Sequence, residues 1–146
     1  MKKMILAATC ALLATVGAAI AEEHVIEMHN KGEKGVMVFV PDIVRAAPGD
    51  TVRFVAVDKG HNAETIKGMV PENADGFKGK INEEFTVTLE KEGIYGVKCA
   101  PHYGMGMVAL ITVGEPVNTA EAETVKHPGK AGKVFAELFG QVVASN

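Results

Sequence analysis

The chain has 146 residues, a formal net charge of −3 and a mean hydropathy of +0.13. This slightly acidic balance argues against a nucleic-acid-binding protein, and after the first twenty residues no apolar run is long enough to span a bilayer. The length is sufficient for one domain with a core of its own.

The N-terminus has the pattern of a secretory signal peptide. Lys2 and Lys3 precede an apolar run over residues 4–20, and Ala19-Ile20-Ala21 provides a cleavage site of the small-x-small type. We therefore expect residues 1–21 to be removed and residues 22–146 to form a single mature domain. Cys10 leaves with the leader, and the expected location is the periplasm, where the protein is free of the membrane and monomeric.

The first part of the mature chain consists of short β-type segments divided by turn signals. Pro48 and Gly49 suit the central positions of a type II turn, and the longest irregular stretch covers residues 64–82. Several short strands at this spacing are typical of an antiparallel sandwich. The segments expected to be strands are residues 24–29, 36–40, 43–47, 51–57, 84–89, 93–99 and 108–113, so that strands occupy about residues 23–113.

The C-terminal part changes to helical periodicity over about residues 118–145. Asn118 and Thr119 can cap a short helix that continues to Lys126, and Pro128 can open a second helix. The second helix has one apolar face, which we expect to pack on the sandwich. The residues of this face are Val134, Phe135, Leu138, Phe139, Val142 and Val143.

Residues 93–107 hold the most informative motif of the chain. Side chains alternate along a strand, so Cys99 shares the inward face with Tyr95 and Val97. His102 follows three residues after Cys99, and Met105 and Met107 follow His102. A thiol, an imidazole and a thioether are therefore expected on one short loop.

An unpaired cysteine in an exported protein points to a reactive thiol, an intermolecular disulfide or a metal ligand. Imidazole and sulfur donors together suit copper, and two histidines, one cysteine and a weak axial methionine form a blue-copper electron-transfer site. The second histidine is expected to be His61, in a loop upstream. Zinc bound by Cys99, His61, His102 and another ligand is an alternative, although methionine is a poor zinc ligand. A Cys/His nucleophile is a second alternative, but no orienting acid is evident.

With these residues in place, the chain resembles the pseudoazurins, a group of small bacterial cupredoxins. The resemblance depends on Cys99-Ala100-Pro101-His102, on Met107, on His61-Asn62 and on the helical tail. It implies an all-β fold, an eight-stranded Greek-key cupredoxin sandwich with two C-terminal helices. It also implies one copper ion, cycling between Cu(II) and Cu(I), held by His61, Cys99, His102 and Met107. Spacing alone leaves Met105 open as the axial ligand, and the resemblance favours Met107.

The resemblance also assigns the surroundings of the site. Asn62, Pro101 and Met37 are expected next to the ligands, and the backbone N–H of Asn62 is expected to donate to the sulfur of Cys99. Docking of partners is expected around the exposed edge of His102, in an apolar patch that includes Met105 and Gly60. A ring of basic side chains around the patch would consist of Lys31, Lys59, Lys78 and Lys98. His24, His29 and His127 are assigned to the surface or to packing.

By this resemblance the protein is an electron carrier and not an enzyme. The implied partners are periplasmic redox proteins, namely copper nitrite reductase or other enzymes of denitrification, and cytochromes c. A copper storage or delivery protein is the alternative function. Such a protein would need clusters of exposed methionine or histidine, and the sequence has no Met-rich tract.

Overall fold

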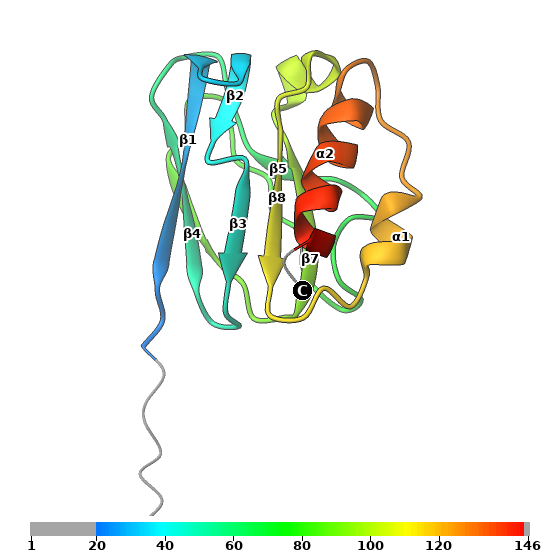
Figure 1. The fold of residues 1–146 in the computed structure, drawn as a ribbon. Helices are drawn as coiled ribbons and strands as arrows, with labels where there is room; N and C mark the ends of the chain where they lie inside the picture. Colours follow the sequence, from blue (N-terminus) through cyan, green and yellow to red (C-terminus); the bar gives the residue numbers. More distant parts are fainter. Residues whose placement is uncertain (1–19, 145–146) are drawn as a thin grey trace, which may run out of the picture.

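The computed structural model describes residues 20–144, which form two four-stranded sheets packed face to face with helices on one side (Figure 1). The first sheet has the order β2-β1-β4-β6 and the second has the order β3-β8-β7-β5. The expected signal peptide, residues 1–21, lies outside the described residues except for its last two positions. The strands are β1 (Glu23–Gly32), β2 (Gly35–Val40), β3 (Ile43–Ala46), β4 (Thr51–Ala56), β5 (Glu64–Thr65), β6 (Phe85–Thr88), β7 (Gly93–Lys98) and β8 (Val108–Val113).

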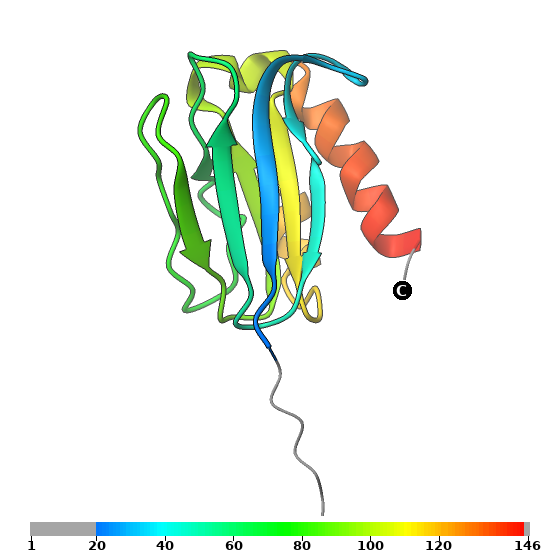
Figure 2. The same ribbon diagram turned by 90° about the vertical axis from the view of Figure 1, so that its left-hand side faces the viewer.

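The eight strands and two α-helices agree with the fold predicted from the sequence, but the sandwich is not wholly antiparallel. β1 pairs with β4 in parallel, and β3 pairs with β8 in parallel. Figure 2 shows β1 and β4 in the front layer, with β8 and α2 behind them. The antiparallel expectation was wrong because turn signals describe only neighbouring strands, whereas both parallel pairs join strands that are distant in the sequence.

The core between the two sheets is centred on Phe54, which has no exposed surface. Its ring stacks on Phe85 with centroids 5.1 Å apart and also contacts Phe39 and Phe77. Aromatic side chains bury large areas, so this cluster stabilises the packing of the two sheets. Cys99 and Met107 belong to the same continuous core.

A second core lies between the sheet β3-β8-β7-β5 and the helices α1 (Thr119–Glu123) and α2 (Ala131–Ala144). All six residues of β8 are buried because one face of this sheet meets the other sheet and its opposite face meets α2. The predicted packing face of α2 is correct except at Val143, which is 62% exposed. No helix within residues 20–144 is long and apolar enough to cross a membrane.

The predicted type II turn and the predicted helix cap differ in how they compare with the structure. The type II turn is confirmed, since the N–H of Asp50 donates to the carbonyl of Ala47 at 3.0 Å and Gly49 has a φ of 93°. The expected helix cap is wrong, because the Asn118 side chain makes no capping hydrogen bond. Instead its Oδ1 accepts from the N–H of Ile94 and its Nδ2 donates to the carbonyl of the same residue. Asn118 therefore joins α1 to β7.

Asp50 is a buried carboxylate at the end of the sandwich where β1 begins. The backbone N–H of Glu22 donates to its Oδ1, and the His24 ring and the N–H of Ala47 contact its Oδ2. These contacts, led by the bond from Glu22, lower the pKa of Asp50 from 3.8 to about 2. The carboxyl of the unfolded chain then binds a proton at a higher pH than the folded one. The ionised Asp50 therefore stabilises the folded protein above pH 3.8, and this stabilisation is lost as the pH falls toward 2.

We expect the free energy of unfolding to decrease as the pH falls through this window, and Asp50→Asn to remove that part of the dependence. Urea denaturation of the metal-free protein at several pH values measures this free energy of unfolding. The exposed Asp75, replaced by Asn, is the matched control. Equal slopes for the wild type and Asp50→Asn would contradict the account.

Candidate metal centre

Three segments that are distant in the sequence meet at one end of the sandwich. The loop after β4 carries His61, the turn after β7 carries Cys99 and His102, and β1 carries Asn30 near its end. Figures 1 and 2 show the 3-10 helix η1 (Ala100–Met105), which contains His102, at the end opposite the start of β1. Within η1 the N–H of His102 donates to the carbonyl of Cys99 at 3.2 Å, so the chain turns back toward the strand.

The predicted thiol and both predicted imidazoles converge. Nδ1 of His61 lies 3.1 Å from Nδ1 of His102, and Sγ of Cys99 lies 3.7 Å from the first nitrogen and 3.5 Å from the second. Ligand atoms about 2.0–2.3 Å from one ion are about 3–4 Å from each other. The three donor atoms are therefore spaced as ligands of a single metal ion.

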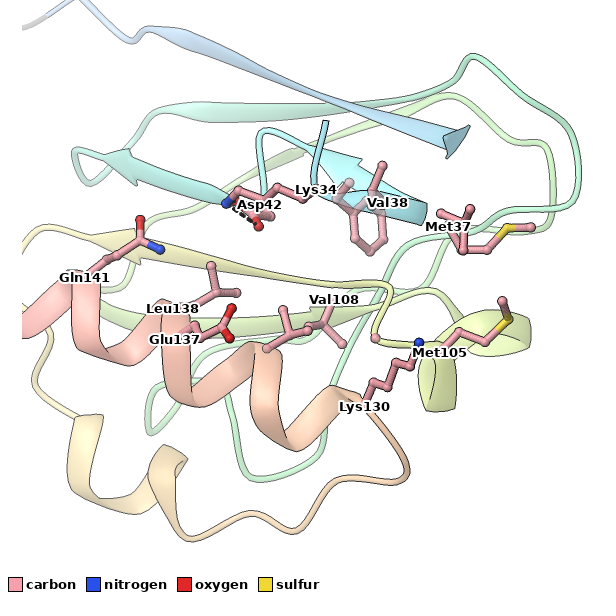
Figure 3. A pocket seen from close by; sticks show the side chains of 15 residues that line it. Lys34, Met37, Val38, Asp42, Met105, Val108, Lys130, Glu137, Leu138 and Gln141 are labelled. Atoms are coloured by element: carbon pink, nitrogen blue, oxygen red, sulfur yellow. Dashed lines mark hydrogen bonds and ion pairs between the residues drawn. The ribbon is translucent and has the colours of Figure 1, made fainter. Parts of the chain in front are cut away.

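The two methionines that spacing allows as axial ligand differ in burial. Met107 has no exposed surface, and its carbonyl accepts the N–H of Cys99 at 3.0 Å. Met105 is 46% exposed and lines a surface groove, where Figure 3 shows it at the same end as Met37. Of the two methionines, Met107 is therefore the one whose side chain is buried in the same core as Cys99.

Asn30 orients His61, a role that was not predicted from the sequence. Oδ1 of Asn30 lies 2.9 Å from Nε2 of His61. When Nε2 carries the proton and donates to Asn30, the lone pair of Nδ1 faces Cys99 and His102. Burial, and next the charge of His102, lower the pKa of His61, so the ring stays neutral and able to bind a metal. Nothing in the sequence around Asn30 distinguishes it from an ordinary turn residue.

Cys99 is the free cysteine of the described residues and is completely buried. Burial raises the pKa of its thiol, while hydrogen bonds from the backbone N–H groups of Asn62 and His102 act in the opposite direction. A thiol with a raised pKa and no exposed surface is a poor nucleophile. These properties disfavour the nucleophile alternative and agree with a sulfur that loses its proton to a metal.

Asn62 connects the two loops that carry the donors. Its Oδ1 accepts the N–H of Ala100 at 2.8 Å, and its Nδ2 donates to the carbonyl of Gly79 and to Glu64, each at 3.1 Å. The loop of His61 is also held by Asn82, which accepts from Gly60 and donates its N–H to His61. Hydrogen bonds within the protein thus hold both loops that carry the donors.

Apolar and basic groups surround this end of the protein. Pro101 is exposed, His102 and Met37 are half-buried, and Lys31, Lys59 and Lys78 are exposed. Lys98 is 26% exposed and lies 3.3 Å from Glu64, which also lies 3.7 Å from Lys78. Glu64 therefore offsets part of the charge of two of the four predicted docking lysines, a pairing that no local pattern in the sequence indicates.

The other histidines lie outside the cluster. Glu22, His24 and Asp50 also come within 4.8 Å of one another, but N–H groups already occupy both oxygens of Asp50. His29 contacts Glu27 at 2.8 Å, and His127 contacts the hydroxyl of Tyr103.

Comparison with known proteins identifies the family. The copper-binding proteins of the plastocyanin/azurin family match residues 26–114. The pseudoazurin of Paracoccus pantotrophus is 52% identical over 137 residues, which cover 93% of this chain and 94% of that protein. The chain belongs to the pseudoazurins. It is an electron-transfer copper protein that binds one copper ion, and it is not an enzyme.

Solved pseudoazurin structures share its fold. The pseudoazurin from Methylobacterium extorquens AM1 is 49% identical, with a TM-score of 0.80 over 82% of this chain and 98% of that chain. Native pseudoazurin from Hyphomicrobium denitrificans is 46% identical, with a TM-score of 0.78 over 82% of this chain and 97% of that chain. The cupredoxin fold expected from the sequence is confirmed. Copper, and not zinc, is the metal of this pseudoazurin family.

Proposed function

We propose that the protein is a periplasmic electron carrier that delivers single electrons to copper nitrite reductase or another enzyme of denitrification, with cytochromes c as further partners. The observation that carries the proposal is the buried, unpaired thiol of Cys99 within 3.7 Å of two imidazole nitrogens. The signal-peptide pattern of residues 1–21 supports the periplasm, and we propose that residues 22–146 act as one monomeric domain.

Four side chains would hold the copper: Nδ1 of His61, Nδ1 of His102, the thiolate of Cys99 and the thioether of Met107. The donor set of two imidazoles, one thiolate and one thioether is the set that supports blue-copper electron transfer. When bound, copper supplies a one-electron couple between Cu(II) and Cu(I). The two histidines donate through lone pairs, and Cys99 must lose its proton.

The protein limits structural change when the electron arrives or leaves. Asn30 holds His61, and Asn62 and Asn82 hold the loops on either side of the cluster. Hydrogen bonds from Asn62 and His102 to the sulfur tune its donor strength. His102 is half-buried whereas His61 and Cys99 are fully buried, so its ring edge is the shortest route to the surface.

Copper storage or delivery is the weaker function. Release to a partner needs donors that the partner can reach, but His61, Cys99 and Met107 each have no exposed surface. A buried, pre-arranged site suits electron exchange through His102 without loss of the ion.

Rapid mixing of the reduced, copper-loaded protein with copper nitrite reductase tests the proposal. We expect reoxidation within the mixing experiment and nitrite-dependent turnover. Fractionation of the native host, followed by N-terminal sequencing, should find a periplasmic protein that begins at Glu22. A reduced protein that is never reoxidised by the reductase would refute the donor role, and a cytoplasmic protein with an intact leader would refute the location.

We propose that Lys31, Lys59, Lys78 and Lys98 steer acidic partners toward an apolar patch that contains Pro101, Met105 and Met37. A positive face on an acidic protein speeds encounter through an electrostatic attraction that salt screens. Lys59 is exposed and has no ion pair among the described residues, whereas Lys98 is held by Glu64. Lys59 should therefore contribute more than Lys98.

We expect Lys59→Glu to slow the bimolecular reaction with an acidic partner by about three- to ten-fold at low ionic strength and to flatten its salt dependence. Stopped-flow rates over a series of salt concentrations measure both effects. Lys91→Glu is the matched control, because Lys91 is exposed in the turn before β7, at the opposite end of the sandwich. If both variants slowed the reaction equally, the effect would come from net charge alone, and the docking face would be refuted.

A further inference from the structure

The segment between α1 and α2 is in contact with the loop that carries the copper ligands. Figure 1 shows this segment rising from α1 to the end of the sandwich where η1 lies. The hydroxyl of Tyr103 lies 2.6 Å from Nδ1 of His127, and the N–H of Lys130 donates to the carbonyl of Gly104 at 2.9 Å. Tyr103 directly follows His102, so both bonds restrain the outer side of the ligand loop.

The Tyr103 hydroxyl donates to Nδ1 of His127 when the imidazole is neutral and carries its proton on Nε2. Burial lowers the pKa of His127, which favours the neutral ring. The His127 ring is held in turn by Phe135 of α2, with ring centroids 4.4 Å apart, and Lys98 lies 4.9 Å from the centre of the Tyr103 ring.

Two glycines allow the ligand loop and the C-terminal extension to pack closely. Gly129 has a φ of 53°, and a Cβ atom there would collide with the carbonyl oxygen of Gly104. Gly106 has a φ of 92°, and a Cβ atom there would lie 3.1 Å from Val134 of α2. Glycine is the residue that permits both the positive φ and the close approach. The contact between loop and tail is therefore continuous from Tyr103 to Gly106.

We infer that the C-terminal extension clamps the ligand loop and that His127 is a positioning residue for the copper site, acting through Tyr103. The extension thus does more than cover the sheet. By holding Tyr103 and Gly104 from outside, it restricts the movement of His102, the partly exposed ligand candidate, while Asn62 holds the loop from inside. The inference about copper rests on the proposed ligand set, whereas the restraint on the loop does not need the metal.

Amide hydrogen exchange in the metal-free protein tests the restraint directly. His127→Leu and Tyr103→Phe each remove one partner of the bond and keep an apolar group of similar size. We expect each to speed exchange at the amides of His102, Gly106 and Met107 by about five-fold, the factor that corresponds to one hydrogen bond. The double variant should exchange no faster than either single variant, because both remove the same bond. His127→Asn, which places an acceptor near the position of Nδ1, should restore slow exchange.

Thr124→Val is the matched control, because Thr124 opens the connecting segment and its hydroxyl donates to the carbonyl of Glu121 in α1, and not to the ligand loop. The second measurement is the rate at which a chelator removes copper, which should rise about ten-fold in His127→Leu and Tyr103→Phe. Unchanged exchange, or equal changes in the control, would overturn the clamp. Faster exchange with unchanged copper loss would overturn its link to the copper site, and failure of the wild type to bind copper would refute the ligand set alone.

Discussion

Replacing Cys99 with Ala is expected to abolish the blue colour of the copper-loaded protein and to weaken copper binding by more than about 100-fold. Even partners outside the ligand shell change metal affinity by about 10–100-fold, and Cys99 supplies the anionic sulfur itself. Intense visible absorption in such sites arises from the bond between thiolate and Cu(II), which neither imidazole can replace. Absorption spectroscopy and a competition titration against a chelator measure the two effects.

Cys99→Ser is the companion variant, since it keeps the size of the side chain and replaces only the sulfur. It should lack the intense blue colour as well, and its metal-free thermal unfolding should be close to that of the wild type. Near-ultraviolet circular dichroism checks that both variants retain their packing. A variant that folds and is still blue would show that another group supplies the chromophore.

Met107→Gln is expected to lower the reduction potential by at least about 59 mV, which is a ten-fold change in the equilibrium between Cu(II) and Cu(I). The thioether suits Cu(I), whereas an amide oxygen is a harder donor that favours Cu(II). Met107→Leu, which keeps the apolar packing and removes the donor, should change the potential in the opposite direction. Voltammetry of each purified variant provides the values.

Met105→Gln is the control for this assignment, because Met105 is 46% exposed and stands two residues away on the same loop. Its potential should remain within about 20 mV of the wild type, less than a three-fold change in the equilibrium. A large shift in Met105→Gln with none in Met107→Gln would reverse the assignment of the axial ligand.

The part of the site that could be predicted from sequence is the part encoded in short spacing. His102 follows Cys99 by three residues on the turn after a strand, so both donors lie on one loop. Alternation of side chains along β7 directs Cys99 into the core. His61 was expected only as a histidine in an upstream loop, since no local pattern connects residues so far apart. Spacing leaves both Met105 and Met107 open as the axial ligand, so the choice of Met107 came from the resemblance, and the burial of Met107 agrees with that choice.

The contacts that the sequence did not indicate are all between distant segments. Asn30 reaches His61 from another strand, Glu64 pairs with Lys78 and Lys98, and Asn118 bonds to Ile94 instead of capping α1. Each of these is a polar residue in a turn-like context, where local hydrogen bonding is the ordinary expectation. The parallel pairing of β1 with β4 has the same cause, because register between remote strands has no signature in either strand alone.

A titration of the metal-free protein with Cu(II), followed by visible absorption, tests the central claim most directly. The account predicts an intense blue band that grows linearly and stops at one equivalent of copper. It further predicts that the band disappears on one-electron reduction and returns on oxidation. Binding without intense colour, or colour that does not respond to reduction, would contradict a copper site built on the thiolate of Cys99.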